Sequence, residues 1–252
     1  MVTQEESPKD KHPEGLTRNQ EILADMLFET KQMAPVTRRF GEPGNYRFEK
    51  NERLTSPIDF AQEGEFALKL HEKDPDALLS PIYVNLRNLP ESLVDQVGLV
   101  LSEIPTDEPV DFYTGIPNAG TPLAKAYVKH SGIPYMDIYE KEVTGDGRRI
   151  VSEGNVTAIQ GKKVRLIDDL ATGGDTKLEA IRAAEELGAR VVDILVLVDR
   201  QQGATEQLKE AGYTLKAAFT LDQLLRYGVR TGNLTQEQYV NVRSYLDAQS
   251  SN

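Results

Sequence analysis

The segment Val164–Thr176 brings two acidic residues and a glycine turn together within one short stretch of sequence. An apolar run ends in two adjacent carboxylates, Asp168 and Asp169, and a Thr-Gly-Gly turn then leads into a helix expected to start at Asp175 or Thr176. Backbone N–H groups of such a turn, together with the positive end of a helix, bind phosphate. Carboxylates accept hydrogen bonds from sugar hydroxyls. The segment therefore indicates a site for a sugar phosphate.

The turn itself limits which phosphate motif this can be. Gly173 and Gly174 allow the backbone to approach a ligand closely, and the hydroxyls of Thr172 and Thr176 are additional donors. No Gly-Lys-Ser/Thr follows, as a Walker A loop requires, and the glycines lack the spacing of a dinucleotide G-x-G-x-x-G motif. Two acidic residues alone would more often be a strand end that caps the next helix. The acidic pair and the turn together favour a ligand site.

The flanking sequence predicts the elements that position these residues. Apolar runs and helical periodicity indicate strands at Asp111–Ile116, Ile133–Tyr139, Lys163–Asp168 and Val191–Val198, with helices at 121–130 and 176–187. Such alternation implies an α/β fold, in which right-handed crossovers join a central parallel sheet flanked by helices. Ligands of these sheets lie beyond the carboxyl ends of the strands. Asp168 falls at one such end and the glycine-bearing turn Gly115–Gly120 at another.

Capping residues predict where two of the helices begin and end. Thr121 is expected as an N-cap, Pro122 as the first helical residue, and Gly132 just past the end of that helix. Thr235 and Gln238 have the spacing of a capping box for a last helix that runs to about residue 248.

The rest of the chain divides into three regions. Residues 1–15 are polar and predict a loose terminus. Residues 16–62 predict a helix over 16–33, followed from residue 34 by a long connection or a small insertion. Residues 63–252 are expected to form the main domain. Within it the pattern predicts strands from Phe66 and at Pro81–Leu86, a helix at Glu91–Ile104, and an exposed polar flap at Glu140–Gly154.

Composition excludes several classes of function. The net charge is −11 and Lys and Arg form no long run, so no nucleic-acid or anionic-membrane partner is expected. No stretch approaches the roughly 20 apolar residues of a membrane helix, and the first residues lack the apolar core of a signal peptide. The absence of cysteine removes disulfides and thiol nucleophiles, and the three histidines lie far apart. We expect a cytoplasmic protein.

The acidic pair and its turn resemble the motif with which type I phosphoribosyltransferases bind phosphoribosyl pyrophosphate (PRPP). Other segments, in the same order, resemble the orotate phosphoribosyltransferases of that family: Phe66–Lys69 with Ser80–Arg87, Gly115–Ala124, Asp199–Gly203, and Leu221–Leu225 with the final helix. The resemblance covers about residues 63–248 and the helix at 16–33. It implies the type I phosphoribosyltransferase fold, with a small hood formed by N-terminal segments.

The resemblance also implies a role for each matching residue. Asp168 and Asp169 would hold the ribose hydroxyls, directly or through Mg²⁺. The 5-phosphate would be bound by Thr172, Gly173, Gly174, Asp175 and Thr176, the pyrophosphate by Asn118, Ala119 and Gly120, and the base and its carboxylate by Lys69 and Arg200. Lys141, on the flap, would reach the reacting groups. Arg200 could instead form an ion pair at the strand end, and Lys69 could be an exposed strand residue.

The flap departs from the pattern of the family. Glu140, Thr144 and Asp146 stand where the family has Arg, Lys and His or Tyr, and Ala119 stands where many members have Lys. Cations at these places stabilise negative charge that grows on the departing pyrophosphate. The nearby Arg148 and Arg149 could substitute for them or could belong to a solvated hairpin.

The resemblance implies a Mg²⁺-dependent, homodimeric transferase that converts orotate and PRPP into orotidine 5′-phosphate and pyrophosphate. Two alternatives remain open. The altered flap would fit a PRPP- or nucleotide-binding regulatory protein with impaired catalysis. The interruption of the Lys69 segment by residues 71–79 would fit transfer to another base.

Overall fold

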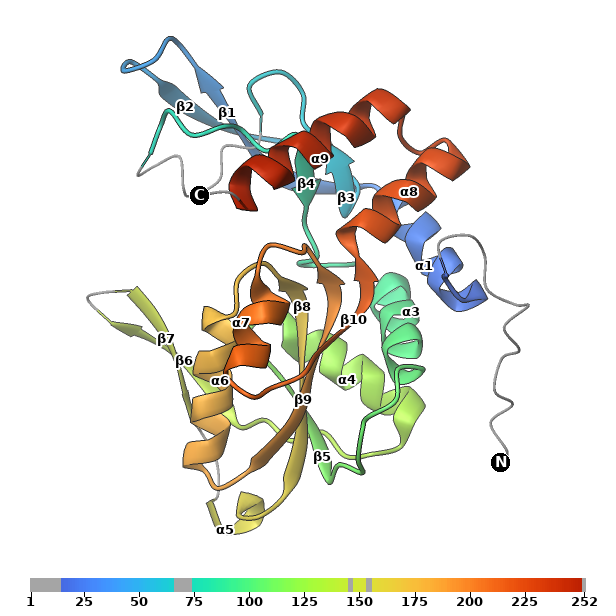
Figure 1. Ribbon diagram of the computed structural model, residues 1–252, viewed down its shortest axis with the longest axis vertical. Helices are drawn as coiled ribbons and strands as arrows, with labels where there is room; N and C mark the ends of the chain where they lie inside the picture. Colours follow the sequence, from blue (N-terminus) through green and yellow to red (C-terminus); the bar gives the residue numbers. More distant parts are fainter. Residues whose placement is uncertain (1–14, 66–73, 145–146, 153–155, 251–252) are drawn as a thin grey trace. The chain divides into compact units, whose positions relative to one another are not determined.

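A computed structural model describes residues 15–65, 74–144, 147–152 and 156–250 of the protein, with backbone alone for 141–144, 147–149, 156 and 250 (Figure 1). Lys69 and the strand expected from Phe66 lie outside the described residues. The chain divides into two compact units: residues 1–23 with 87–224, and residues 24–86 with 225–252. We call these the sheet unit and the hairpin unit.

The sheet unit contains a four-stranded sheet in the order β10-β9-β8-β5, and every neighbouring pair is parallel. Its strands are β5 (Phe112–Gly115), β8 (Lys163–Ala171), β9 (Arg190–Asp199) and β10 (Leu215–Thr220). Helices α3 (Glu91–Ser102) and α4 (Gly120–Ser131) lie on one face, and α6 (Asp175–Glu186) and α7 (Ala204–Glu210) on the other, while α5 (Val156–Ile159) precedes β8 (Figure 1). The predicted parallel α/β sheet flanked by helices is confirmed.

Burial on both faces explains the sequence of the central strands. The centre of β9, from Ile194 to Val198, is fully inaccessible to water, as are Val164, Leu166 and Ile167 of β8. Such strands read as continuous apolar runs because helices cover both faces of a parallel sheet.

A charged pair lies within this apolar layer. Arg165 of β8 is fully buried and donates two hydrogen bonds to the carboxylate of Asp193 on β9, at 2.6 and 2.7 Å. The guanidinium group also donates to the carbonyls of Ile104 and Pro105. Each charge is therefore paired and hydrogen-bonded, as burial of a charged group requires.

Three predictions in the sheet unit need correction. β8 continues to Ala171, because β9 is long enough to pair with it as far as Ala171 and Asp199, so the acidic pair lies inside the strand. The expected strand Ile133–Tyr139 is reduced to a single bridge between Tyr113 and Tyr135. Helix α4 starts at Gly120, so its N-cap is Ala119 and not the predicted Thr121. Gly132 does end that helix in a left-handed conformation.

The predicted flap is an antiparallel hairpin of β6 (Tyr139–Thr144) and β7 (Gly147–Ser152). Two hydrogen bonds anchor this hairpin on α6. The hydroxyl of Tyr139 donates to the carbonyl of Ala180 at 2.8 Å, and the N–H of Ile150 donates to the carboxylate of Glu179 at 3.0 Å. Tyr139 and Ile150 are both buried, whereas Glu140 is exposed.

The hairpin unit is built on β1 (Gln32–Phe40) and β2 (Arg47–Thr55), which pair antiparallel over their whole length. The region expected to be a connection or insertion, residues 34–62, is therefore mostly strand. A second pair joins β3 (Ile58–Phe60) to β4 (Ile82–Val84), and α9 (Gln236–Ser250) follows the capping box. The N–H of Gln238 donates to Thr235 Oγ1 and the N–H of Thr235 to Gln238 Oε1, which confirms that box.

Two helices run from one unit into the other along the chain, α1 (Arg18–Glu29) and α8 (Leu221–Thr231). The first confirms the helix predicted within 16–33, although it ends earlier because Gln32 already belongs to β1. Among the described residues no helix has the length and apolar character needed to cross a membrane. The hood expected from the N-terminal segments stays a prediction.

Candidate functional site

The acidic pair of β8 is held by a lysine that the sequence did not single out. Asp168 is 5% exposed, and its Oδ2 lies 2.9 Å from Nζ of Lys177. Its Oδ1 accepts a hydrogen bond from the N–H of Asp169 at 2.9 Å. Lys177, also 5% exposed, donates a second hydrogen bond to the carbonyl of Leu170. Both oxygens of Asp168 are therefore engaged by the protein.

The position of Lys177 is unfavourable unless a negative charge compensates it. Burial penalises an ammonium group, and the first turn of α6 carries the positive end of the helix dipole. The carboxylate of Asp168 supplies that charge within hydrogen-bonding distance. The sequence signal for this contact is no more than a lysine directly after the glycine turn, and the packing of α6 on β8 identifies its partner.

Asp169 has a different environment from its neighbour. Burial, and next the negative charge of Asp168, raise the pKa of the Asp169 carboxyl to about 7, while Lys177 and Arg87 act in the opposite direction. A carboxyl with this pKa exchanges its proton near neutral pH. It accepts hydrogen bonds from sugar hydroxyls best in its ionised form, and a nearby cation favours that form.

The turn that follows, Thr172–Thr176, leads directly into α6, as the sequence predicted. Thr172, Gly173, Asp175 and Thr176 are exposed, whereas Gly174 is buried. An exposed turn at the start of a helix has the donors and the dipole that an anion needs.

One donor of the turn is already occupied by a side chain from α7. The N–H of Gly174 donates to Gln207 Oε1 at 2.7 Å, and Gln207 Nε2 donates to Asp175 Oδ1 at 2.6 Å. A Cβ atom at position 174 would lie 2.8 Å from Gln207 Oε1, so the glycine permits this approach. Sequence reasoning missed Gln207, because nothing in its local sequence connects it to a turn 33 residues earlier.

The second glycine turn, Gly115–Gly120, lies against the acidic pair. A Cβ atom on Gly120 would lie 2.2 Å from the carbonyl oxygen of Ile167 and 3.0 Å from Cα of Asp168. The N–H of Ile116 donates to the same Ile167 carbonyl at 2.8 Å. This contact places the start of α4 beside β8. Asn118, Ala119 and Gly120, predicted to bind pyrophosphate, are thus brought next to Asp168, with Asn118 exposed.

Arg200 directly follows β9, at the carboxyl ends of the strands where the acidic pair of β8 also lies. Its N–H donates to the carbonyl of Ala171, the last residue of β8, at 2.9 Å. The preceding carboxylate, Asp199, accepts hydrogen bonds from the N–H of Gln201 and the hydroxyl of Thr205. The structure places the backbone of Arg200 directly after the end of β9, and its role toward a base stays a prediction. Lys69 and the side chain of Lys141 lie outside the described residues.

Within the described residues, no group of three or more His, Asp or Glu side chains is arranged to hold a metal ion. Asp168 and Asp169 are the acidic residues predicted to hold one, and the first of them is paired with Lys177.

Comparisons with known proteins show which family the chain resembles. The family model for the phosphoribosyl transferase domain matches residues 101–217. An orotate phosphoribosyltransferase of Sulfurisphaera tokodaii is 30% identical over 171 residues, which cover 67% of this chain and 85% of the relative. That of Methanopyrus kandleri is 40% identical over 115 residues, covering 45% of this chain and 60% of the relative.

A solved structure shows the same likeness. UMP synthase from Leishmania donovani superposes with a TM-score of 0.62 and 30% sequence identity, covering 76% of this chain and 40% of that one. The chain therefore spans less than two thirds of this synthase and of the Methanopyrus kandleri enzyme.

Proposed function

Because the chain belongs to the type I phosphoribosyltransferase family, we propose that it transfers the phosphoribosyl group of PRPP to orotate, giving orotidine 5′-phosphate and pyrophosphate. The observation that carries the proposal is the acidic pair of β8 beside both glycine turns, at the edge of the sheet where ligands of parallel sheets bind. The names of the relatives that are 30 and 40% identical support orotate as the acceptor.

Different residues of the site would bind different parts of PRPP. The turn Thr172–Thr176 and the start of α6 would bind the 5-phosphate. Asp169 would accept hydrogen bonds from the ribose hydroxyls, because both oxygens of Asp168 are engaged. The turn Asn118–Gly120 would face the pyrophosphate. With these parts fixed, C1 of the ribose is presented to the acceptor in one orientation, which lowers the entropic cost of reaction.

On the acceptor side, Arg200 would bind the base, and Lys69, which lies outside the described residues, keeps the base-binding role that the resemblance implies. A guanidinium group binds a planar carboxylate through two parallel hydrogen bonds, which suits the carboxylate of orotate. The bond from N1 of the base to C1 of the ribose would form as the bond from C1 to the pyrophosphate oxygen breaks, and the proton of N1 would pass to the departing pyrophosphate or to water. Negative charge then grows on the leaving group, so donors that face it stabilise the transition state more than the ground state.

We propose Mg²⁺ as the cofactor. Mg²⁺ in proteins is commonly bound by one or two carboxylates together with substrate phosphates, and the adjacent Asp168 and Asp169 would supply the carboxylates. Asp169, with Asp168 beside it, would hold the ion, which would supply positive charge at the leaving pyrophosphate. A homodimer is also proposed, since Lys141 lies on a flap hairpin and flaps in this family reach into a partner's site.

A second candidate is a PRPP-binding protein without efficient transfer. One feature favours it: Glu140 is exposed on the flap where the family has a cation. In that case PRPP would bind while no base reacts. A phosphoribosyltransferase for another base would bind PRPP equally and differ only in its acceptor.

The test is a transfer assay with PRPP, Mg²⁺ and a panel of orotate, uracil and purine bases, combined with calorimetric titration of PRPP. Loss of orotate absorbance that requires PRPP supports the first proposal. PRPP binding without turnover of any base supports the second, and turnover of another base alone identifies a different acceptor. Asp169→Asn is the control, because it removes the charge that should hold the ribose.

A further inference from the structure

β1 and β2, which form the long hairpin of the hairpin unit, differ in what covers their outer edges. β1 is covered on its outer side at one end: the N–H of Arg39 donates to the carbonyl of Gly64 at 2.7 Å, and Arg38 forms a bridge with Glu65. Among the described residues, β2 has β1 as its one strand neighbour. The outer edge of β2 thus presents a row of backbone donors and acceptors, which is a template for another strand.

One face of β2 is exposed and carries both apolar and charged side chains. Side chains alternate along a strand, so Phe48, Lys50, Glu52 and Leu54 share a face. All four are exposed, Phe48 to 37% and Leu54 to 60%. Met33, opposite Leu54 on β1, is 59% exposed on the same face. A large apolar side chain at each end of β2 therefore flanks two opposite charges in the middle.

The sequence of β2 is complementary to its own reverse. Around Asn51 the strand reads R-F-E-K-N-E-R-L-T. When two copies run antiparallel with Asn51 opposite Asn51, each Lys50 faces a Glu52 and each Phe48 faces a Leu54. Opposite-charge pairs and apolar pairs directly across two strands stabilise antiparallel sheets.

We propose that β2 is a docking edge for a second copy of this chain. The two β2 strands pair antiparallel about Asn51 and extend the two hairpins into one four-stranded sheet. The contact is isologous, since the same surface serves both copies, and it closes with two-fold symmetry.

The charges select this register over its neighbours. A slip of two residues in one direction places Lys50 opposite Lys50, and a slip in the other direction places Glu52 opposite Glu52. Like charges directly opposite each other are destabilising. A slip of one residue would turn the exposed face of one copy to the other side of the sheet. Only the register centred on Asn51 pairs both charges and both apolar residues.

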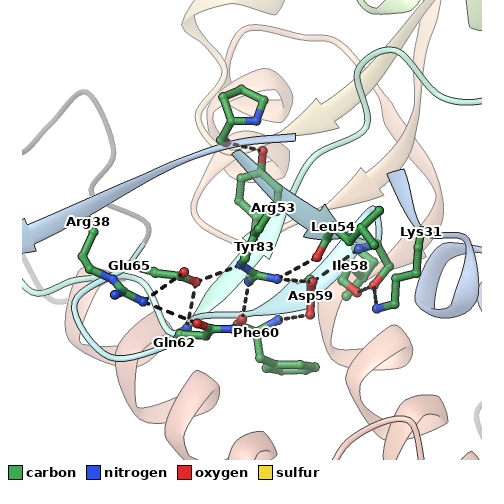
Figure 2. A network of polar contacts seen from close by, with 12 residues as sticks. Lys31, Arg38, Arg53, Leu54, Ile58, Asp59, Phe60, Gln62, Glu65 and Tyr83 are labelled. Atoms are coloured by element: carbon green, nitrogen blue, oxygen red, sulfur yellow. Dashed lines mark hydrogen bonds and ion pairs between the residues drawn. The ribbon is translucent and has the colours of Figure 1, made fainter. Parts of the chain in front are cut away.

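The opposite face of the hairpin is anchored by ion pairs of Arg53 and Arg38. Figure 2 shows Arg53 between two carboxylates: its Nε lies 3.1 Å from Glu65 and its Nη1 3.0 Å from Asp59. Arg38 reaches the same Glu65 at 3.4 Å. Because these contacts engage the other face, Lys50 and Glu52 stay on the exposed one. A preorganised strand loses less conformational entropy on pairing.

Charge reversal tests the register. The particle mass is measured by light scattering over a range of concentrations for the wild type, Lys50→Glu, Glu52→Lys and the double variant. Each single substitution places like charges opposite each other twice, so its association should weaken roughly tenfold or more. The double variant should associate as the wild type does, and a mixture of the two single variants should form mixed pairs. Equal masses for all four proteins would overturn the proposal.

A cysteine cross-link tests the centre of symmetry. The chain has no cysteine, so Asn51→Cys introduces a single thiol that faces itself across the two-fold axis. Mild oxidation should join two chains through it, because Cβ atoms of directly opposed residues lie about 4.5–5.5 Å apart, close to disulfide geometry. Glu206→Cys, exposed in the sheet unit, is the matched control. Cross-linking no faster than in this control contradicts the pairing, whichever other surface the chains use to associate.

Discussion

Nζ of Lys177 lies 2.9 Å from Oδ2 of Asp168, and both side chains are buried. The pair joins the first turn of α6 to β8, and so it fixes the glycine turn relative to the acidic pair. The elements proposed to bind the phosphate and the ribose are thereby held at one spacing, as the binding of a ribose 5-phosphate would require.

Replacing Lys177 by Met should destabilise the protein, because it leaves the carboxylate of Asp168 buried without its partner. The expected loss in the free energy of unfolding is about 3–5 kcal/mol. The double variant Lys177→Met/Asp168→Asn should recover much of this loss, since no buried charge remains in the pair. Urea unfolding of the wild type, both single variants and the double variant measures the coupling. Strictly additive losses would show that the two side chains do not depend on each other.

Asp169 should make the stability of the ligand-free protein depend on pH. Its pKa is raised to about 7 in the folded chain, whereas an aspartate in an unfolded chain titrates at about 4. Between these values the folded state binds more protons, so the contribution of Asp169 to stability falls as the pH rises from about 4 to about 7. Asp169→Asn should equal the wild type in stability at the lower end of this range and exceed it above the upper end. Unfolding curves at several pH values test this, and a difference that does not change with pH contradicts it.

Gln207 should lower the affinity of the turn for phosphate, because its side-chain oxygen occupies the N–H of Gly174. Gln207→Ala should strengthen binding of inorganic phosphate and PRPP about fivefold, the equivalent of about 1 kcal/mol for one hydrogen bond. Calorimetric titration gives the affinities, with the exposed neighbour Glu206→Ala as control. Weaker binding in Gln207→Ala would mean instead that the side chain supports the turn in its binding conformation.

The sequence predicted the sheet and the acidic pair because both are local patterns. The apolar run of β9 and the motif of β8 can be read without knowledge of their neighbours. The partner of Asp168 could not be predicted, since it depends on how α6 packs on its strand. The hairpin of β1 and β2 was not predicted, for another reason. In β2, Arg47 to Glu52 are all exposed, so no alternation of apolar and polar residues marks the strand.

A side chain at position 120 should destabilise the protein. A Cβ atom there would lie 2.2 Å from the backbone oxygen of Ile167, so α4 would have to move away from β8. Gly120→Ala should lower the free energy of unfolding by about 1–3 kcal/mol, the usual cost of overpacking, and weaken PRPP binding. Gly173→Ala is the matched control for stability, because its nearest neighbour would be 3.9 Å away. Equal stability of the two variants would show that the turn can shift without cost.

The flap offers a test of catalysis apart from binding. Thr144 stands where the family has a lysine, and a cation there would face the charge that grows on the leaving pyrophosphate. One donor of this kind contributes on the order of 10²–10³ in rate, so Thr144→Lys should raise the rate of transfer markedly while the affinity for PRPP changes little. Gln236→Lys, exposed on α9, controls for the added charge. Transfer as slow as in the wild type, with PRPP bound equally well, would show that the limiting defect lies outside this position.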